Sequence, residues 1–126
     1  MDHTLKTGIQ GRHEITVGTK DTATAYGSGL VDVFATPAMI ALMENTAHQS
    51  VQPHLPGGHL TVGFEVNIRH VKATPVGGRV WAKTELLGIE GKKLTFSVKA
   101  FDEGGEIGSG THTRYIVNQQ KFMERL

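Results

Sequence analysis

A sustained helical pattern occupies residues 33–52, VFATPAMIALMENTAHQSVQ. Apolar and small residues recur there at spacings of three and four, so one helix face would carry Met39, Ile40, Leu42, Met43, Thr46, Ala47, Ser50 and Val51. Thr36 is predicted to cap the N-terminus, and Pro37 suits the first helical position, where no N–H is needed. Pro53 ends the helix. The stretch therefore predicts one long helix with a face to bury.

A carboxylate lies at the border of this apolar face. At about 100° per residue, Glu44 falls beside Ile40 and Val51, whereas the polar side carries Asn45, His48, Gln49 and Gln52. A carboxylate at the edge of a buried face is a candidate for a functional site. The ordinary alternative is a surface carboxylate that pairs with His48, one helical turn further on.

After the helix the sequence favours β structure. Residues 60–71 alternate, which predicts a strand whose one face carries Leu60, Val62, Phe64, Val66, Ile68 and His70. Further strands are predicted at 80–89, 94–100 and 107–117, with turns at Glu90-Gly91 and at 102–105. Gly108 and Gly110 in the last strand indicate a bulge, strong twist or close backbone approach. Before the helix, residues 13–17 and 22–26 also favour β structure, and a short helix could follow Asn118.

This order of elements predicts an α+β fold in a single domain spanning residues 1–126. Four consecutive antiparallel strands need a cover on one face, and the helix at 33–52 is the element available to provide it. We therefore expect an antiparallel sheet wrapped around one central helix.

Composition narrows the functional classes. The 126 residues include 13 basic and 12 acidic side chains, for a net charge of +1, so no charge block indicates a nucleic acid or a membrane surface as partner. The absence of cysteine excludes disulfides and thiolate chemistry. The longest apolar run, residues 38–43, is too short to cross a bilayer, and the N-terminus lacks the apolar core of a signal peptide. We expect a cytoplasmic protein.

Three stretches resemble the hotdog-fold thioesterases related to the fluoroacetyl-CoA-specific enzyme. They are VFATPAMIALMENTA (33–47), TVGFEVNIRHVKATPVGGRV (61–80) and DEGGEIGSGTHTRYIV (102–117), and they cover about half of the chain. The string EIGSGTHTR and the threonine, glutamate and histidine in register are the specific features. The resemblance implies a hotdog fold and an obligate homodimer whose two sheets join edge to edge. It also implies that an acyl thioester binds at the subunit interface and is hydrolysed without a metal or redox cofactor.

The same resemblance assigns roles to individual residues. It implies that Thr36, Glu44 and His70 are catalytic, and that Gly63 and Arg114 contact the substrate. Phe34 is expected to help set the depth of the acyl pocket. Compared with the fluoroacetyl-specific enzyme, the lid segment TAYGSGLVDVFA (24–35) is short and has few aromatic residues, and Pro37 replaces a glycine.

Each of these residues also has an ordinary interpretation. Thr36 could serve only as a helix cap, and His70 could be a core histidine with satisfied hydrogen bonds. A set of basic residues could bind coenzyme A phosphates or simply line a solvated sheet face: Arg69, Lys72, Arg79, Lys83 and Arg114. The spacing of His48, His54 and His59 matches no zinc pattern, so no metal is expected.

Our hypothesis from the sequence is an acyl-CoA thioesterase that acts on a small or medium acyl group. Two alternatives remain open. One is an enoyl-CoA hydratase-like enzyme on the same fold, which turnover of crotonyl-CoA would reveal. The other is a non-catalytic module that binds acyl-CoA without releasing thiol.

Overall fold

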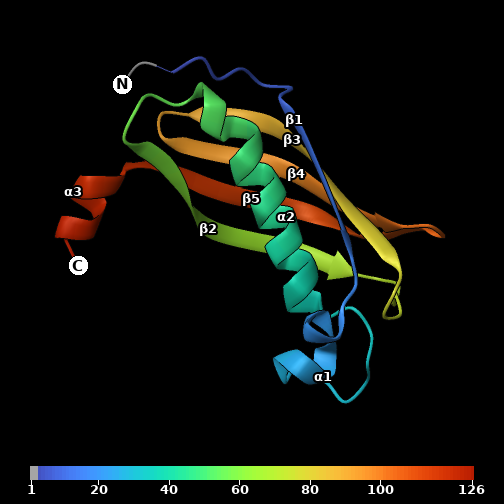
Figure 1. Ribbon diagram of the computed structural model, residues 1–126. Helices are drawn as coiled ribbons and strands as arrows, with labels where there is room; N and C mark the ends of the chain where they lie inside the picture. The colour runs from blue at the N-terminus through green and yellow to red at the C-terminus, as the bar shows by residue number, and fades with distance from the viewer. Residues whose placement is uncertain (1–2) are drawn as a thin grey trace.

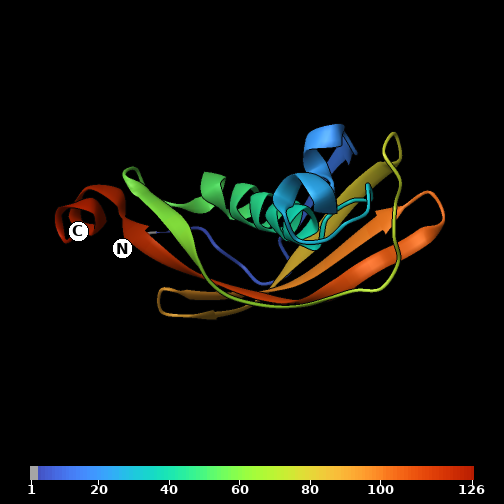
Figure 2. The same ribbon diagram turned by 90° about the horizontal axis from the view of Figure 1, so that it is seen from below.

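One antiparallel sheet curves around one long helix in the computed structural model, which describes residues 3–126 (Figures 1 and 2). The sheet order is β1-β3-β4-β5-β2. The strands are β1 (Gln10–Thr16), β2 (His59–His70), β3 (Arg79–Glu90), β4 (Lys93–Asp102) and β5 (Gly105–Asn118). The helices are α1 (Ala23–Tyr26), α2 (Thr36–Val51) and α3 (Gln119–Glu124), with 3-10 turns at Thr19–Asp21 and Gln52–His54. This arrangement confirms the predicted sheet around a central helix.

The core lies between α2 and the concave face of the sheet (Figure 2). From α2 it receives Ala38, Met39, Leu42, Met43, Thr46, Ala47 and Val51. Compared with the predicted face, Ala38 is an addition, and Ile40 and Ser50 are only partly buried. Every second residue of β3 and β4 is buried against it, including Val80, Ala82, Leu86, Leu94, Phe96 and Val98. Full burial of each large apolar side chain contributes about 1.5–3 kcal/mol, so this interface holds the helix in place.

The start of α2 differs from the prediction. Ala35 occupies the N-cap position without a side-chain cap, and Thr36 is the first helical residue, followed by Pro37. The cap prediction for Thr36 is therefore wrong. Its hydroxyl is instead bonded to His70, which is far away in sequence. At the other end, α2 stops at Val51 and Pro53 lies in the 3-10 turn that follows.

The predicted β structure at 22–26 is also wrong. Thr22 is an N-cap whose side chain accepts a hydrogen bond from Ala25 N at 3.1 Å, and Gly27 ends the helix with a left-handed φ of 70°. A capping threonine and a C-cap glycine outweighed the β preference of the residues between them.

β2 contains a bulge that reverses its faces halfway. Gly63 pairs with Arg114 and Glu65 with Thr113, so Phe64 is an extra residue. Before the bulge, Thr61 and Gly63 face α2, whereas Phe64 is 68% exposed and packs edge-to-face on Tyr115. After it, His70 faces α2. The prediction of one continuous face from Leu60 to His70 is thus wrong for its first half, because one inserted residue shifts the alternation.

Close backbone approach explains the glycines of β5. A Cβ on Gly108 would lie 2.6 Å from Met39 Cε and 2.7 Å from the Arg69 carbonyl oxygen, and one on Gly110 would overlap the Asn67 carbonyl. The close approach predicted for this strand is confirmed. The β3–β4 turn falls at Gly91-Lys92, one residue later than predicted, and the short C-terminal helix is present as α3. None of the helices in the described part of the chain is long and apolar enough to cross a membrane.

Candidate active site

Thr36 and His70 form a hydrogen-bonded pair where α2 begins and β2 ends. Thr36 Oγ1 lies 2.8 Å from His70 Nδ1. Thr36 is exposed and His70 is partly buried. Phe34, which is 1% exposed, packs edge-to-face on the imidazole with ring centroids 6.3 Å apart. The three residues border a cleft of about 290 Å³, whose other walls are formed by Ala23, Ser28, Val33, Ala35 and residues 71–73.

The environment of His70 favours the neutral imidazole. Burial lowers the pKa of His70 from its ordinary value of 6.5, and the nearby backbone of Lys72 opposes this only partly. Its Nε2 atom is buried and makes no hydrogen bond of ordinary geometry to any residue between 3 and 126. A neutral imidazole can take a proton from a hydroxyl, so the pair has the geometry of a nucleophile with its base.

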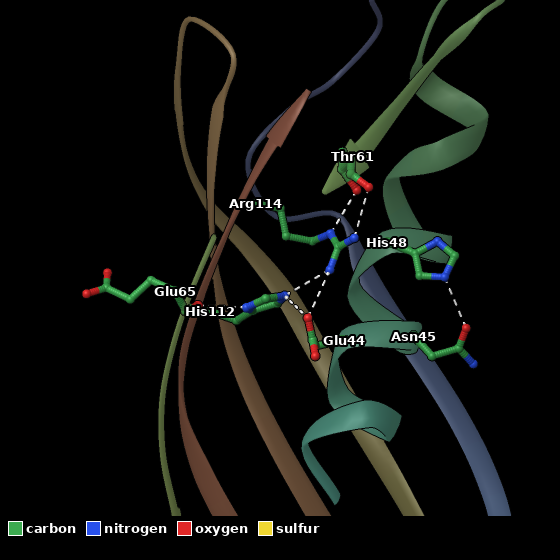
Figure 3. Close-up of polar contacts among 7 residues, drawn as sticks. All are labelled: Glu44, Asn45, His48, Thr61, Glu65, His112 and Arg114. Carbon is green, nitrogen blue, oxygen red and sulfur yellow. Dashed lines mark hydrogen bonds and ion pairs between the residues drawn. The ribbon is translucent and has the colours of Figure 1, made fainter. Parts of the chain in front are cut away.

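Glu44 lies on α2 in a second group of polar residues (Figure 3). Its Oε2 atom is 3.5 Å from Arg114 Nη1 and 3.7 Å from His112 Nε2. The carboxylate also covers Gly63, because a Cβ built there would lie 2.6 Å from Glu44 Oε2. The alternative in which Glu44 only pairs with His48 does not hold, because His48 Nε2 lies 3.1 Å from Asn45 Oδ1 instead.

Arg114 is the buried cation of this group, with 7% of its surface exposed. Its Nε donates to Thr61 Oγ1 at 2.8 Å and its Nη2 donates to the Thr61 carbonyl at 3.0 Å. Its Nη1 lies 3.1 Å from His112 Nε2. The interpretation of Arg114 as part of a solvated sheet face is therefore wrong. A buried guanidinium needs compensation, and here Glu44 supplies the opposite charge.

The two groups are separate within one protomer. Thr36 and Glu44 are eight residues apart on α2, which corresponds to a rise of about 12 Å along the helix axis. The structure thus brings Thr36, His70 and Phe34 together, and it brings Glu44, Gly63 and Arg114 together. Sequence analysis gave no role to His112 or Thr61. The spacing of His112 and Arg114, two residues apart on a strand, was the signal that they share a face.

Three of the other basic candidates, Lys72, Arg79 and Lys83, have partners within the chain. Lys72 Nζ donates to Asp102 Oδ1 at 2.7 Å, and Arg79 Nε lies 3.4 Å from Glu14 Oε2. Lys83 Nζ lies 5.5 Å from the centre of the Phe101 ring. Within residues 3–126, no group of three or more histidine, aspartate or glutamate side chains is arranged to hold a metal ion.

Known structures share this architecture. A fluoroacetyl-CoA thioesterase variant solved in complex with acetyl-CoA superposes with a TM-score of 0.91 at 31% identity, covering 96% of each chain. A thioesterase superfamily member from Thermus thermophilus gives a TM-score of 0.88 at 25% identity, covering 95% of this chain and 89% of that one. The sheet around one long helix is therefore the hotdog fold, and the class is that of hotdog thioesterases.

Sequence comparison identifies the family. The family model described as fluoroacetyl-CoA-specific thioesterase matches residues 17–120. The fluoroacetyl-CoA thioesterase of Streptantibioticus cattleyicolor is 40% identical over 91 residues, which are 72% of this chain and 66% of that protein, just under two thirds of its length. The chain belongs to the fluoroacetyl-CoA-specific thioesterase family.

Proposed function

We propose that the protein is a cytoplasmic homodimer that hydrolyses a small or medium acyl-CoA thioester to the free acid and coenzyme A. The observation that carries this proposal is the 2.8 Å contact between Thr36 Oγ1 and His70 Nδ1 at the mouth of a cleft. Family membership supports the same reaction class. The chemistry needs a hydroxyl, a base and water, and it requires neither a metal nor a redox cofactor.

In the proposed first step, Thr36 Oγ attacks the thioester carbonyl while His70 Nδ1 takes the hydroxyl proton. The carbonyl oxygen becomes negative in the tetrahedral intermediate. Because Thr36 is the first residue of the 16-residue helix α2, this charge develops beside a helix N-terminus, where it is stabilised. The C–S bond then breaks, and His70 returns its proton to the departing thiolate. The product is an ester on Thr36.

In the second step, Glu44 acts as the base that activates water toward this ester. The alternative role, in which a carboxylate orients His70, is disfavoured because His70 Nε2 is already buried within its own protomer. Water gives its proton to Glu44, the hydroxide attacks the ester carbonyl, and the C–O bond to Thr36 breaks. The departing Thr36 oxygen takes the proton from Glu44, which restores the hydroxyl and the carboxylate, and the free acid leaves.

This assignment requires Glu44 to come from the partner subunit, because Glu44 lies too far along α2 from Thr36 in the same protomer. The free edge of β2 supports such a dimer. Five consecutive residues there, 63–67, are exposed, and they include Phe64 at 68% and Val66 at 38%. An uncovered apolar edge strand invites pairing with another strand, and an antiparallel β2–β2 contact is closed by a two-fold axis.

The register of that contact can be stated. A two-fold axis at Asn67 would pair Glu65 of one subunit with Arg69 of the other. Because Phe64 is the extra residue of the bulge, Gly63 of one subunit would then lie opposite His70 of the other, and both face the helix side of the sheet. Directly opposed residues of antiparallel strands have Cα atoms about 4.5–5.5 Å apart. Because Glu44 covers Gly63, the partner subunit's Glu44 would then adjoin Thr36 and His70. In this arrangement Gly63 and Arg114 would line the acyl site from one subunit and Phe34 from the other.

The test is release of free thiol from a panel of acyl-CoAs of increasing chain length. Turnover is expected for the purified protein. Thr36→Ala, His70→Ala and Glu44→Gln should each lower kcat by about 100-fold or more, since each removes an acid, base or nucleophile. Circular dichroism and sedimentation of each variant report folding and association. Wild-type turnover in all three variants, or tight acyl-CoA binding without thiol release, would reject the proposal.

A further inference from the structure

His112 lies behind Glu44 at the centre of a set of hydrogen bonds that the proposed reaction does not use (Figure 3). The side chain is 1% exposed and its ring stacks on Phe96, with ring centroids 6.3 Å apart. Nδ1 lies 2.8 Å from the Glu65 carbonyl oxygen, and Nε2 lies 3.1 Å from Arg114 Nη1. Each ring nitrogen therefore has a partner that can only accept or only donate a hydrogen bond.

These partners determine which ring nitrogen carries the proton. The Glu65 carbonyl only accepts hydrogen bonds, so His112 Nδ1 must carry the hydrogen and donate it. The Arg114 guanidinium only donates, so Nε2 must present its lone pair. Both bonds form together only in the neutral Nδ1–H tautomer. Protonation of Nε2 would place an N–H against the N–H groups of Arg114 and break that contact.

Arg114 and His112 together hold the β2 bulge from both sides. Arg114 binds the side chain and carbonyl of Thr61, which precedes the bulge. His112 binds the carbonyl of Glu65, which follows it, while the Glu65 side chain points away (Figure 3). Of the three residues between these anchors, Gly63 is the one that Glu44 covers. The hydrogen bond between His112 and Arg114 thus links the anchors on the two sides of the bulge, where the proposed contact between subunits lies.

The same guanidinium nitrogen faces the proposed base. Arg114 Nη1 lies 3.1 Å from His112 Nε2 and 3.5 Å from Glu44 Oε2. If His112 Nε2 could not accept a hydrogen bond, Arg114 Nη1 would lose one of these two partners. It could then turn fully toward the Glu44 carboxylate. The position of Glu44 over Gly63 therefore depends on how His112 holds Arg114.

We propose that neutral His112 is a positioning residue: it fixes Arg114 and, through Arg114, both the β2 bulge and the carboxylate of Glu44. This inference rests on the proposed role of Glu44 as base. The charged side chains that act on the imidazole are Arg114 on β5 and Glu44 on α2, and the titratable side chain of His48 on α2 is close enough to Arg114 and Glu44 to feel both charges. Burial lowers the pKa of His112, and the charge of Arg114 lowers it further against the opposing effects of the Glu65 carbonyl and Glu44.

Two conservative variants separate positioning from packing. In His112→Gln the amide oxygen can replace Nε2 as the acceptor for Arg114, whereas in His112→Asn the shorter amide can replace only the Nδ1 donor. We expect His112→Asn to lower kcat roughly 10- to 100-fold with little change in KM, because a displaced base loses reactivity before it loses binding. His112→Gln should recover most of that loss. His48→Gln, a change at a neighbouring histidine that contacts Asn45, is the matched control and should keep wild-type kcat.

A measurement on the wild-type protein tests the same inference without a substitution. Nitrogen-15 NMR of the histidine rings at neutral pH should show His112 as the Nδ1–H tautomer, and a charged or Nε2–H ring would overturn the proposal. Equal losses in His112→Asn and His112→Gln, or a change in KM alone, would overturn it too. Glu44→Gln in the same assay distinguishes the two proposals: if it is inactive while His112→Asn is unchanged, only the role of His112 fails. If Glu44→Gln turns over normally, the role of Glu44 fails and this inference falls with it.

Discussion

The proposed role of Thr36 depends on whether its hydroxyl bonds to the backbone N–H groups of the first helical turn or to His70. A threonine at the start of a helix ordinarily bonds to the free N–H groups of the first turn. In this protein the N-cap position falls on Ala35, and Pro37 removes one of those N–H groups. The hydroxyl instead bonds to His70. A one-residue shift in the start of α2 therefore converts a structural threonine into a candidate nucleophile.

The first prediction concerns the pH dependence of turnover. His70 must be neutral to accept the Thr36 proton, and burial holds its pKa below 6.5. As pH falls through 6.5, an ordinary histidine would become charged, whereas His70 stays neutral until the pH falls below its own lowered pKa. We expect kcat/KM for acyl-CoA to stay level through pH 6.5 and to decline only at lower pH. A pH–rate profile of the wild-type enzyme checks this, and a midpoint above 6.5 would contradict it.

The second prediction uses Gly63, where a methyl group would displace the carboxylate of Glu44, the proposed base. The Cβ of Gly63→Ala would lie 2.6 Å from Glu44 Oε2, which is the far end of a flexible side chain that can move aside. We expect kcat to fall about 100-fold from a displaced carboxylate, with little loss of stability.

Gly108→Ala provides the contrasting control. Its Cβ would lie 2.7 Å from the Arg69 carbonyl oxygen, which belongs to the backbone and cannot move cheaply. Overpacking of this kind costs about 1–3 kcal/mol, so this variant should lower the thermal midpoint. Activity and thermal unfolding measured on both variants test the distinction, and an active Gly63→Ala would contradict the proposed position of Glu44.

At the scale of elements, the sequence predicts the long-range pattern better than the local irregularities. The 3.6-residue period of α2 and the alternation of β4 follow from burial on one face, and both patterns can be recognised in a single sequence. The β2 bulge is different, because the extra residue is accommodated by pairing with β5 and by the bonds of Arg114 to Thr61. Gly63 is the local signal there, but a glycine inside a strand can mark either a bulge or a close backbone approach, so it does not fix the position of the extra residue. As a result the positions of His70 and Arg114 relative to Glu44 had to come from the structure.

The connection after β2 is fixed by a buried carboxylate, which gives the third prediction. Asp102 is 7% exposed and accepts hydrogen bonds from Lys72 Nζ at 2.7 Å, Thr74 Oγ1 at 2.9 Å and Gly104 N at 2.8 Å. It thereby ties the segment that follows His70 to the β4–β5 turn. Asp102→Asn replaces an acceptor oxygen by an amino group and leaves donors facing donors. We expect a loss of about 1–3 kcal/mol in the free energy of unfolding.

Glu14→Gln is the control for that experiment. Glu14 lies 3.2 Å from Arg12 and 3.4 Å from Arg79, but both arginines are about half exposed. Exposed ion pairs contribute about 0–1 kcal/mol, so this variant should unfold close to the wild type. Urea denaturation at one fixed protein concentration measures both, because the stability of the proposed dimer would depend on protein concentration. Equal losses in the two variants would show that burial of Asp102 does not matter.

At the scale of the whole molecule, the proposal states that no protomer contains a complete site. Thr36 and His70 lie at one end of β2, and Glu44 covers Gly63 nearer the middle of the same strand. An antiparallel β2–β2 seam would place each subunit's Glu44 beside the other subunit's Thr36. Two complete sites then exist in each dimer, and each one uses both chains.

Mixed dimers test this arrangement directly. When Thr36→Ala and Glu44→Gln chains are combined, a mixed dimer has one site with both changes and one site with neither. Random pairing makes half of the dimers mixed, so two inactive parents should together recover about a quarter of the wild-type rate. Thr36→Ala combined with His70→Ala is the control: these residues bond within one protomer, so every site keeps one defect and no activity returns. The measurement is thiol release after the two chains are refolded together. Recovery in the control, or none in the Thr36→Ala and Glu44→Gln mixture, would mean that the site is not divided between subunits in this way.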